Sequence, residues 1–431
     1  MKIEELYPVF LKHPAITTDS RVVKRDGLFF ALKGEHFDGN AYARQAIDHG
    51  CAYAIIDNPS FKQGEQFILV RDVLTTLQLL ANYHRQHLDI PVIGITGSNG
   101  KTTTKELIAA VLSKKYKITS TQGNLNNHIG VPLTLLSFLQ DTNIGIVEMG
   151  ANHPGEIKDL CIIAEPSHGL ITNIGKAHLE GFGSVENIIR TKKELYDFVT
   201  ARQGEIFYNA NDKLLSGFVN ELKVNSISFG DPGRSKVYGS KIPSGIFLWL
   251  KVFIESREYT LQTKLIGDYN IDNILAALAV GNYFGVDDRR MIEAIEDYKP
   301  ENNRSQYIET RHNHVFLDAY NANPTSVKAA IDNFEQLKVS PKWIILGDMF
   351  ELGVDAINDH LEIVQLIEKN NYEKIILVGD IFSSLTLSRE ILQFKNVDLL
   401  KDWLNKNAVK GSNILIKGSR GNQLEKIVEF L

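Results

Sequence analysis

Residues 94–105 read Gly94-Ile95-Thr96-Gly97-Ser98-Asn99-Gly100-Lys101-Thr102-Thr103-Thr104-Lys105, a glycine-rich stretch that closes on a lysine and hydroxyl residues. The short apolar run at 90–93 in front of it predicts a buried parallel strand. Behind it, apolar residues recur at helical spacing, at Leu107, Ile108, Val111 and Leu112. A strand, a glycine-rich loop and a helix in this order are typical of a phosphate-binding loop.

The chemistry of such a loop explains its residue types. Glycines let backbone N–H groups converge on phosphate oxygens, and the helix N-terminus adds a favourable dipole. Lys101 would reach the β- and γ-phosphates, and the Thr102 hydroxyl would hold Mg²⁺. The strict motif has a glycine where this chain has Ile95, and glycines stand at Gly94 and Gly97 instead. The flanking elements favour a site for ATP or a close relative over a chance glycine-rich turn.

Composition restricts the class of protein. With 431 residues, 43% hydrophobic and 23% charged, the chain predicts two or three domains with sizeable cores. The net charge of -5 argues against nucleic-acid binding through a broad basic surface. Only Cys51 and Cys161 occur, which suits a reducing cytosol. The N-terminus lacks the apolar core of a signal peptide, and no apolar run reaches membrane-spanning length, so we expect a cytoplasmic protein.

Residues 1–86 predict a small α/β domain that stands apart from the phosphate-binding loop. Strands are expected at 28–32 and 51–56 with a helix at 41–49 between them, and a helix from Asp72 to His87 leads into the loop. The polar segments at 18–21 and 33–39 are solvated loops or part of a site.

Residues 87–300 alternate strands with helices, which predicts a parallel sheet. Three expected strands, 144–147, 169–172 and 206–208, run into Glu148, Asn173 and Asn209, and His178 follows the second. Ligands bind at the carboxyl ends of parallel strands, where the phosphate-binding loop also lies. Glu148 and His178 are therefore expected to converge near the phosphates, with Glu148 holding Mg²⁺, although either residue alone is more often structural.

Lys192 interrupts an apolar stripe. Ser184 is expected to cap a helix whose apolar residues are Val185, Ile188, Ile189, Leu195, Tyr196 and Val199, and Lys192 falls in the middle of them. A buried ammonium is costly unless it is paired, neutralised or modified. Either the side chain reaches solvent from the edge of the stripe, or it is neutral enough to capture CO₂ as a metal-binding carbamate.

The end of the central region predicts a β-hairpin insertion over 246–254 and 259–265, followed by an alanine-rich helix over 274–280. Asn270 either caps that helix or contacts a nucleotide base. Residues 301–431 form a third unit, with strands at 315–317, 343–346, 375–378 and 414–416 that end in polar residues. This pattern is Rossmann-like but has no dinucleotide fingerprint.

Together these motifs resemble the Mur ligase family over nearly the whole chain. The segments that carry the resemblance are Asp19-Ser20-Arg21, the loop with its displaced glycine, Gly123-Asn124-Leu125-Asn126-Asn127 with Gly130-Val131-Pro132, Glu148-Met149-Gly150-Ala151, Ala177-His178-Leu179-Glu180-Gly181-Phe182-Gly183-Ser184, Tyr320-Asn321-Ala322-Asn323-Pro324, Gly347-Asp348-Met349, Glu351-Leu352-Gly353 and Lys417-Gly418-Ser419-Arg420. The resemblance implies an α/β fold of three domains: an N-terminal UDP-sugar-binding domain, a central P-loop ATPase domain and a C-terminal Rossmann-like domain. It further implies a bacterial, monomeric, ATP-dependent amide ligase of peptidoglycan synthesis. The His178 and Tyr320 segments are most similar to the branch that joins D-alanyl-D-alanine to UDP-N-acetylmuramoyl-tripeptide.

The resemblance also implies residue roles. ATP would be bound by Gly97, Ser98, Asn99, Gly100, Lys101, Thr102, Thr103, Asn270, Asn273, Arg304 and Asp318. Two Mg²⁺ sites would use Thr102, Glu148, His178 and Lys192 as a carbamate, and the catalytic set is Lys101, Glu148, His178 and Lys192. Ser20 and Arg21 would contact the uridine diphosphate, and Asn126 and Asn127 the muramoyl peptide.

Two departures from the family pattern lie in the third domain: Asn302-Asn303-Arg304 stands where glycine often precedes the arginine, and Gly421-Asn422-Gln423 where methionine is frequent. Three other functions remain open: a sister ligase with another amine substrate, a P-loop kinase, and a binding module without turnover.

Overall fold

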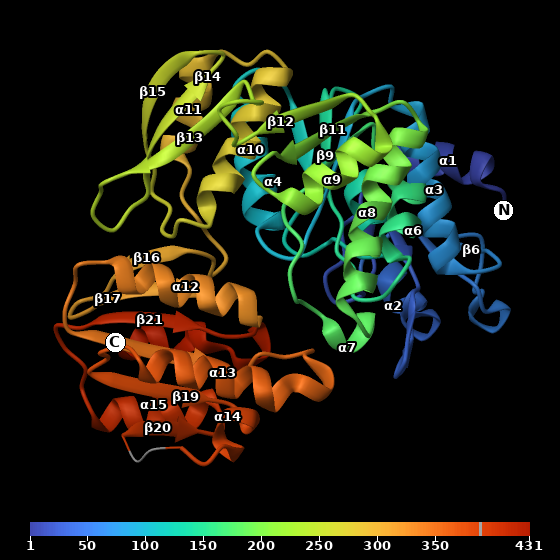
Figure 1. The fold of residues 1–431 in the computed structure, drawn as a ribbon. Coiled ribbons are helices and arrows are strands. Elements are labelled where there is room, and N and C mark those ends of the chain that lie inside the picture. Colours follow the sequence, from blue (N-terminus) through green and yellow to red (C-terminus); the bar gives the residue numbers. More distant parts are fainter. Residues whose placement is uncertain (388–389) are drawn as a thin grey trace.

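The computed structural model describes residues 1–387 and 390–431 and has the predicted α/β class with three domains (Figure 1). Its main sheets have four, nine and six strands, one sheet in each domain. In Figure 1 the N-terminal domain lies at the right, the middle domain above, and the C-terminal domain below at the left. Among the described residues, no helix combines the length and apolar character needed to cross a membrane.

The N-terminal sheet is parallel, in the order β1-β2-β5-β6. Its strands are β1 (Ile16–Thr17), β2 (Leu28–Phe30), β5 (Tyr53–Ile56) and β6 (Phe67–Leu69), with α1 (Ile3–Lys12), α2 (Ala43–Asp48) and α3 (Val73–His87). The predicted elements are confirmed with shorter strands, and the Asp72 carboxylate caps α3 through the Thr75 N–H. The polar segment at 33–39 contains the small hairpin β3 (Lys33–Gly34) and β4 (Phe37–Asp38).

The middle sheet has the order β15-β14-β13-β12-β11-β10-β7-β9-β8. Its parallel strands are β7 (Val92–Thr96), β8 (Ile118–Ser120), β9 (Ile144–Glu148), β10 (His168–Ile171), β11 (Glu205–Asn209) and β12 (Ser226–Phe229), and β12 also pairs parallel with the strand that follows it. The predicted hairpin is β14 (Trp249–Ile254) and β15 (Arg257–Gln262), which pairs with β13 (Val237–Ile242). It therefore extends the main sheet instead of forming a separate insertion.

Helices cover both faces of the middle sheet. One core contains Ile93 and Ile95 with residues of α4 (Lys101–Leu112), α10 (Asn270–Tyr283) and α11 (Asp288–Asp297). The other contains Val92 and Val147 and residues of the helices on the opposite face, chiefly α3, α5 (Gly130–Leu135), α6 (Glu156–Ala164), α8 (Val185–Ala201) and α9 (Lys213–Leu222). Successive side chains of β7 thus enter opposite cores, as a strand buried on both faces requires.

The prediction of a strand at 90–93 was wrong by two to three residues, because β7 is Val92–Thr96. Gly94 belongs to the strand: a Cβ there would lie 3.0 Å from Leu195 Cδ1 and 3.1 Å from Pro166 Cβ. The glycine therefore gives α8 room to approach the strand, and the loop begins only at Gly97.

The C-terminal sheet has the order β16-β17-β21-β18-β19-β20, with β16 antiparallel at one edge. The predicted strands are confirmed as β17 (His314–Asp318), β18 (Lys342–Gly347), β19 (Lys374–Val378) and β21 (Asn413–Lys417); β16 (Gln306–Glu309) and β20 (Ile391–Phe394) were not predicted. The helices are α12 (Pro324–Gln336), α13 (Ala356–Glu368), α14 (Asp380–Ser384) and α15 (Val397–Lys406).

His168 at the start of β10 makes the stability of the fold depend on pH. Its ring is buried beside Tyr283 and Phe207, and this burial lowers its pKa to about 4 from the ordinary 6.5. Between these values the unfolded chain binds more protons than the folded one, so stability falls as the pH drops from 6.5 towards 4. The full loss is roughly 3 kcal/mol. Between pH 7.5 and 4.5, we expect the free energy of unfolding of His168→Gln to fall by roughly 2 kcal/mol less than that of the wild type. Urea unfolding at the two pH values measures both. Equal decreases in the two proteins would contradict this role of His168.

Candidate active site

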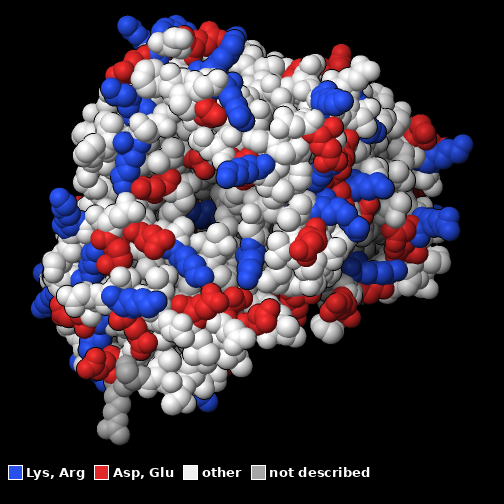
Figure 2. All heavy atoms as spheres, viewed as in Figure 1, with Lys and Arg blue, Asp and Glu red and all other residues white. Residues whose placement is uncertain are grey.

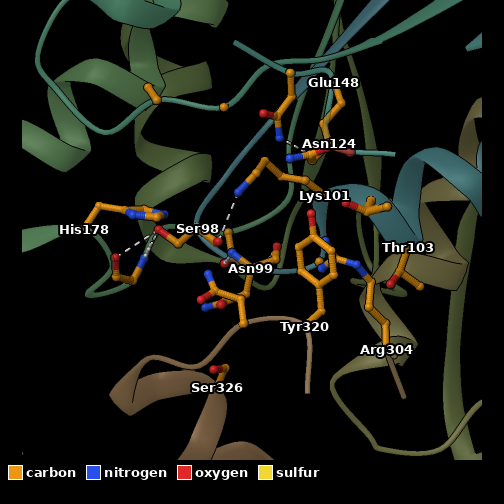
Figure 3. A pocket seen from close by; sticks show the side chains of 18 of the residues that line it. Ser98, Asn99, Lys101, Thr103, Asn124, Glu148, His178, Arg304, Tyr320 and Ser326 are labelled. Carbon is orange, nitrogen blue, oxygen red and sulfur yellow. Dashed lines mark hydrogen bonds between the residues drawn. The ribbon is translucent and has the colours of Figure 1, made fainter. Parts of the chain in front are cut away.

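A cavity of about 850 Å³ lies between the phosphate-binding loop and the C-terminal domain. Figure 2 shows a hollow on the face seen in Figure 1, with a basic side chain deep inside it. Elsewhere on that face, basic and acidic side chains are intermixed. In Figure 3, Lys101 occupies the middle of the cavity, Glu148 and Asn124 lie above it, and His178 lies on one side. Tyr320 stacked with Arg304 lies on the other side.

The phosphate-binding loop depends on two glycines with positive φ. Gly97 has φ 144°, and a Cβ there would lie 2.0 Å from Thr172 Oγ1. Gly100 has φ 79° at the N-cap of α4, and its Cβ would lie 2.7 Å from Asn273 Oδ1. Ser98 N–H donates to the Asn173 carbonyl (2.9 Å), and Asn99 N–H donates to Asn173 Oδ1 (3.0 Å). Asn173, the polar residue that follows β10, therefore holds the phosphate-binding loop in this conformation.

Gly97→Ala is expected to weaken binding of a non-hydrolysable ATP analogue by at least about tenfold, because the loop must shift to accommodate the new Cβ. Titration calorimetry measures the effect. Gly217→Ala is the matched control, since Gly217 lies within α9 and no atom of residues 1–387 or 390–431 lies within 4 Å of the added Cβ, its own neighbours aside. Unchanged affinity in Gly97→Ala would show that this backbone geometry is not needed for binding.

Lys101 begins α4 and lies over the loop. Its Nζ donates to the Gly97 carbonyl (2.6 Å) and the Ser98 carbonyl (3.2 Å). Burial lowers the pKa of this ammonium, which Glu148 opposes and Arg304 reinforces. Thr102 and Thr103 follow in the first turn, both buried and both lining the cavity.

Glu148 ends β9 and is 1% exposed. Its Oε1 accepts a hydrogen bond from Asn126 Nδ2 (2.8 Å), while Oε2 is buried and has no hydrogen-bond partner among the residues that the structure describes. Buried polar atoms are normally paired, so an unpaired carboxylate oxygen facing a cavity fits a cation. Asn126, which we assigned to the peptide substrate, therefore holds Glu148; Asn127 also lines the cavity and accepts from the N–H groups of Ile129 and Gly130.

His178 lines the same cavity as Glu148. Its partner was quoted in a motif but given no role: His178 Nδ1 donates to Glu351 Oε2 of the C-terminal domain. This hydrogen bond lowers the pKa of Glu351, which keeps that residue a carboxylate. Among the described residues, no group of three or more His, Cys, Asp or Glu side chains is placed to hold a metal.

Lys192 lies in α8, which the Ser184 hydroxyl caps as predicted, and only 2% of it is exposed. The interpretation that it reaches solvent is therefore wrong. Its Nζ lies 5.5 Å from the centre of the Phe182 ring. Burial, and then the charge of Lys101, lower its pKa to about 7. The charge of Lys101 thus acts on Lys192, although Lys192 does not itself line the cavity.

Asn270 and Asn273 join α10 to α4. The helix begins at Asn270 itself, and the Asn270 Nδ2 donates to the Ile266 carbonyl (2.8 Å), so the capping interpretation is wrong. Asn273 Nδ2 donates to Asn270 Oδ1 (2.8 Å), and Asn273 Oδ1 accepts from Thr104 Oγ1 (2.9 Å). Both residues line the cavity.

The C-terminal domain supplies Arg304 and Asp318 to the same cavity. The Arg304 guanidinium carbon lies 3.5 Å from the centre of the Tyr320 ring, and Asp318 accepts from Lys417 Nζ (2.6 Å). Asn302 and Asn303 have φ 60° and 59°, a region that asparagine tolerates better than most residues. Asparagines can therefore stand where the family pattern expects glycine.

Two further residues of this site were quoted in motifs but given no role. Asn323 Nδ2 donates to Asn99 Oδ1 (2.8 Å), which joins the C-terminal domain directly to the phosphate-binding loop. Lys417 ends β21 beside Asp318 at the end of β17. The signal for this pair was present, because polar residues at the ends of adjacent parallel strands meet at one edge.

Ser20 and Arg21 do not line this cavity. Ser20 Oγ donates to Gln45 Oε1 (3.4 Å), and the exposed Arg21 guanidinium pairs with Asp19 (2.8 Å). The structure thus brings together the nucleotide and metal candidates and leaves the uridine candidates in the N-terminal domain.

The fold and this cavity define a three-domain P-loop α/β protein with a nucleotide site closed by its C-terminal domain. Family models match in three consecutive parts: "Mur ligase family, catalytic domain" at 14–99, "Mur ligase middle domain" at 95–281 and "Mur ligase, glutamate ligase domain" at 303–420. The chain belongs to the Mur ligase family.

Similar proteins cover nearly the whole chain. It is 36% identical to the UDP-N-acetylmuramoyl-tripeptide--D-alanyl-D-alanine ligase of Bacillus subtilis (strain 168), over 96% of this chain and 92% of that protein. The crystal structure of MurF from Acinetobacter baumannii matches with a TM-score of 0.87 and 28% identity, covering 99% and 98% of the two chains. MurF ligase from Thermotoga maritima in complex with ADP matches with a TM-score of 0.84 and 26% identity, covering 98% and 97%.

Proposed function

We propose that this chain is an ATP-dependent amide ligase that joins D-alanyl-D-alanine to UDP-N-acetylmuramoyl-tripeptide, giving the pentapeptide precursor of peptidoglycan with ADP and phosphate. Relatives that share at least 30% of their residues with this chain carry that activity in their names. One observation carries the proposal: Lys101 and the unpaired oxygen of Glu148 share a cavity with Arg304 and Asp318 of another domain.

The first step activates the acid, because amide formation from a carboxylate in water is uphill. The terminal carboxylate of the tripeptide attacks the γ-phosphorus of ATP in line, and the bond to the β–γ bridging oxygen breaks. An acyl phosphate and ADP result. Lys101 offsets the charge that builds on the transferring group, and the N–H groups of the loop hold the phosphates in position.

The second step forms the amide. The free amine of D-alanyl-D-alanine attacks the acyl carbonyl, and the tetrahedral intermediate loses a proton and expels phosphate. Water would hydrolyse the acyl phosphate, so the C-terminal domain must cover the cavity during both steps. The hydrogen bond from Asn323 to Asn99 supports this role for the domain.

The unpaired oxygen of Glu148 fits a divalent cation. Thr102 would hold one Mg²⁺, and Glu148, His178 and the carbamate of Lys192 would hold a second; bound Mg²⁺ would reduce repulsion between the acid and the γ-phosphate. The unpaired Glu148 oxygen supports the second site. The low pKa of buried Lys192 supports the carbamate, since only a neutral amine captures CO₂.

We further assign the loop residues Gly97–Thr103 to the phosphates of ATP. The nucleoside and phosphates would also be contacted by Asn270, Asn273, Arg304 and Asp318. Ser20 and Arg21 are assigned to the uridine diphosphate. Asn127 would contact the muramoyl peptide, and Asn126 would hold Glu148. We keep the predicted domain boundaries, at 1–86, 87–300 and 301–431, as part of the proposal. We keep a monomeric state as part of the proposal, and use of ATP favours a cytoplasmic enzyme.

The proposal is tested by measuring phosphate release from ATP with UDP-N-acetylmuramoyl-tripeptide, with and without D-alanyl-D-alanine. We expect phosphate to be released only when the dipeptide is present. Separate assays offer diaminopimelate, lysine or glutamate as the amine, each together with the acid substrate that the corresponding sister ligase uses. Phosphate release in one of these assays would identify that sister ligase. A phosphorylated product without an amide would indicate a kinase, and nucleotide binding without turnover a binding module.

A further inference from the structure

Glu351 is a carboxylate of the C-terminal domain that reaches a residue of the middle domain. Its Oε2 accepts from His178 Nδ1, and its backbone carbonyl accepts from Glu180 N–H (3.3 Å). Glu180 belongs to α7 (Leu179–Phe182), the short helix that follows His178. Figure 1 shows α7 at the lower end of the middle domain, beside the segment that precedes α13. Two contacts thus connect the domains at one point.

The C-terminal domain presents Glu351 from a firmly held segment. The buried Asp348 carboxylate accepts from the N–H groups of Ile381 (2.8 Å) and Phe382 (3.0 Å). The next two residues are also held: Met349 N–H donates to His360 Nε2 (3.0 Å), and Phe350 N–H donates to Ser419 Oγ (3.1 Å). The position of Glu351 is therefore fixed relative to the C-terminal sheet, and it moves as that domain moves.

His178 receives this contact in a constrained conformation. It is the N-cap of α7 with φ 53°, a left-handed conformation that is uncommon for residues other than glycine. A carboxylate only accepts hydrogen bonds, so Nδ1 carries the proton in this contact. In the neutral imidazole, Nε2 then keeps its lone pair. Carboxylates that bind one ring nitrogen in this way commonly orient a histidine whose other nitrogen binds a metal.

We propose that Glu351 is a positioning residue that makes the orientation and tautomer of His178 depend on docking of the C-terminal domain. His178 is then ready to act as a ligand through Nε2 only when the domain that covers ATP is in place. The use of that ligand in catalysis rests on the proposed ligase function; the coupling of His178 to Glu351 does not.

The test is ¹⁵N NMR of the histidine rings in the full-length protein, without metal or substrate. The His178 signals are assigned by their loss in His178→Asn. In the wild type we expect a protonated Nδ1 and an unprotonated Nε2 at pH 8, and in Glu351→Ala we expect a mixture of the two tautomers. Glu368→Ala, which removes an exposed carboxylate of α13, is the matched control and should leave the signals unchanged. Glu351→Gln keeps an acceptor oxygen and should retain the wild-type tautomer in part.

A second measurement follows Mn²⁺ by electron paramagnetic resonance in the presence of ADP. We expect Glu351→Ala to weaken Mn²⁺ binding by about 10- to 100-fold, with unchanged ADP affinity in the absence of metal and unchanged thermal unfolding. The proposal is overturned if the His178 signals of Glu351→Ala match those of the wild type, or if Glu368→Ala disturbs them equally. Because the NMR experiment involves no turnover, a failed ligase assay with an intact Glu351 effect would refute the proposed function alone.

Discussion

Replacing Lys101 with alanine is expected to lower kcat by about a thousandfold or more while the protein remains folded. Lys101 is the ammonium held over the phosphate-binding loop, and in the proposed reaction it offsets the charge on the transferring phosphoryl group. Its removal leaves the loop N–H groups to hold the phosphates, so ADP binding should weaken less than kcat falls. Rapid measurement of ADP release gives kcat, and calorimetry gives the affinity.

Lys101→Arg separates charge from shape. Arginine keeps the positive charge but carries a larger, planar group into a half-buried position, so we expect it to recover only a small part of the lost rate. If Lys101→Ala retained more than about a tenth of the wild-type kcat, electrostatic stabilisation by this residue would not be a main part of catalysis.

Replacing Lys192 with alanine is expected to reduce kcat by about a hundredfold or more, because the carbamate that completes the second cation site is lost. Small carboxylates such as acetate should restore part of the activity by entering the space that the side chain leaves. Lys193→Ala is the matched control: its ammonium faces outward and pairs with Asp197 (2.8 Å). Loss of activity without rescue, or equal loss in the control, would count against a carbamate.

The pKa of Lys192 gives this account a pH dependence. Because burial lowers that pKa to about 7, the neutral fraction of the amine rises between pH 6 and 8. Added bicarbonate should therefore stimulate CO₂-depleted enzyme more at pH 8 than at pH 6, and Lys192→Ala should show no such difference. Equal stimulation at both pH values would contradict carbamate formation at this lysine.

Many residues that line the cavity could be predicted because their signals are local. Alternating strands and helices place the phosphate-binding loop, Glu148 and His178 at the carboxyl edge of one parallel sheet. The place of Lys192 in an apolar stripe left two interpretations open, and only the packing of α8 on the sheet decided between them, in favour of burial.

Other features depend on tertiary contacts that the local sequence does not encode. Gly94 looked like part of the loop because glycine is a turn signal, but close packing of α8 places it within the strand. Asn270 looked like a cap, yet its side chain bonds to the Ile266 carbonyl and Asn273. The contact between Glu351 and His178 joins two domains, so no spacing in the sequence could indicate it.

The most direct measurement of the central claim follows oxygen from the acid to phosphate. UDP-N-acetylmuramoyl-tripeptide labelled with ¹⁸O in its terminal carboxylate is incubated with ATP, D-alanyl-D-alanine and the enzyme. Mass spectrometry then measures the ¹⁸O content of the amide product and of the released phosphate. The account predicts that each amide formed is matched by one phosphate that carries an ¹⁸O atom from the acid. Unlabelled phosphate, or phosphate released without amide, would contradict it.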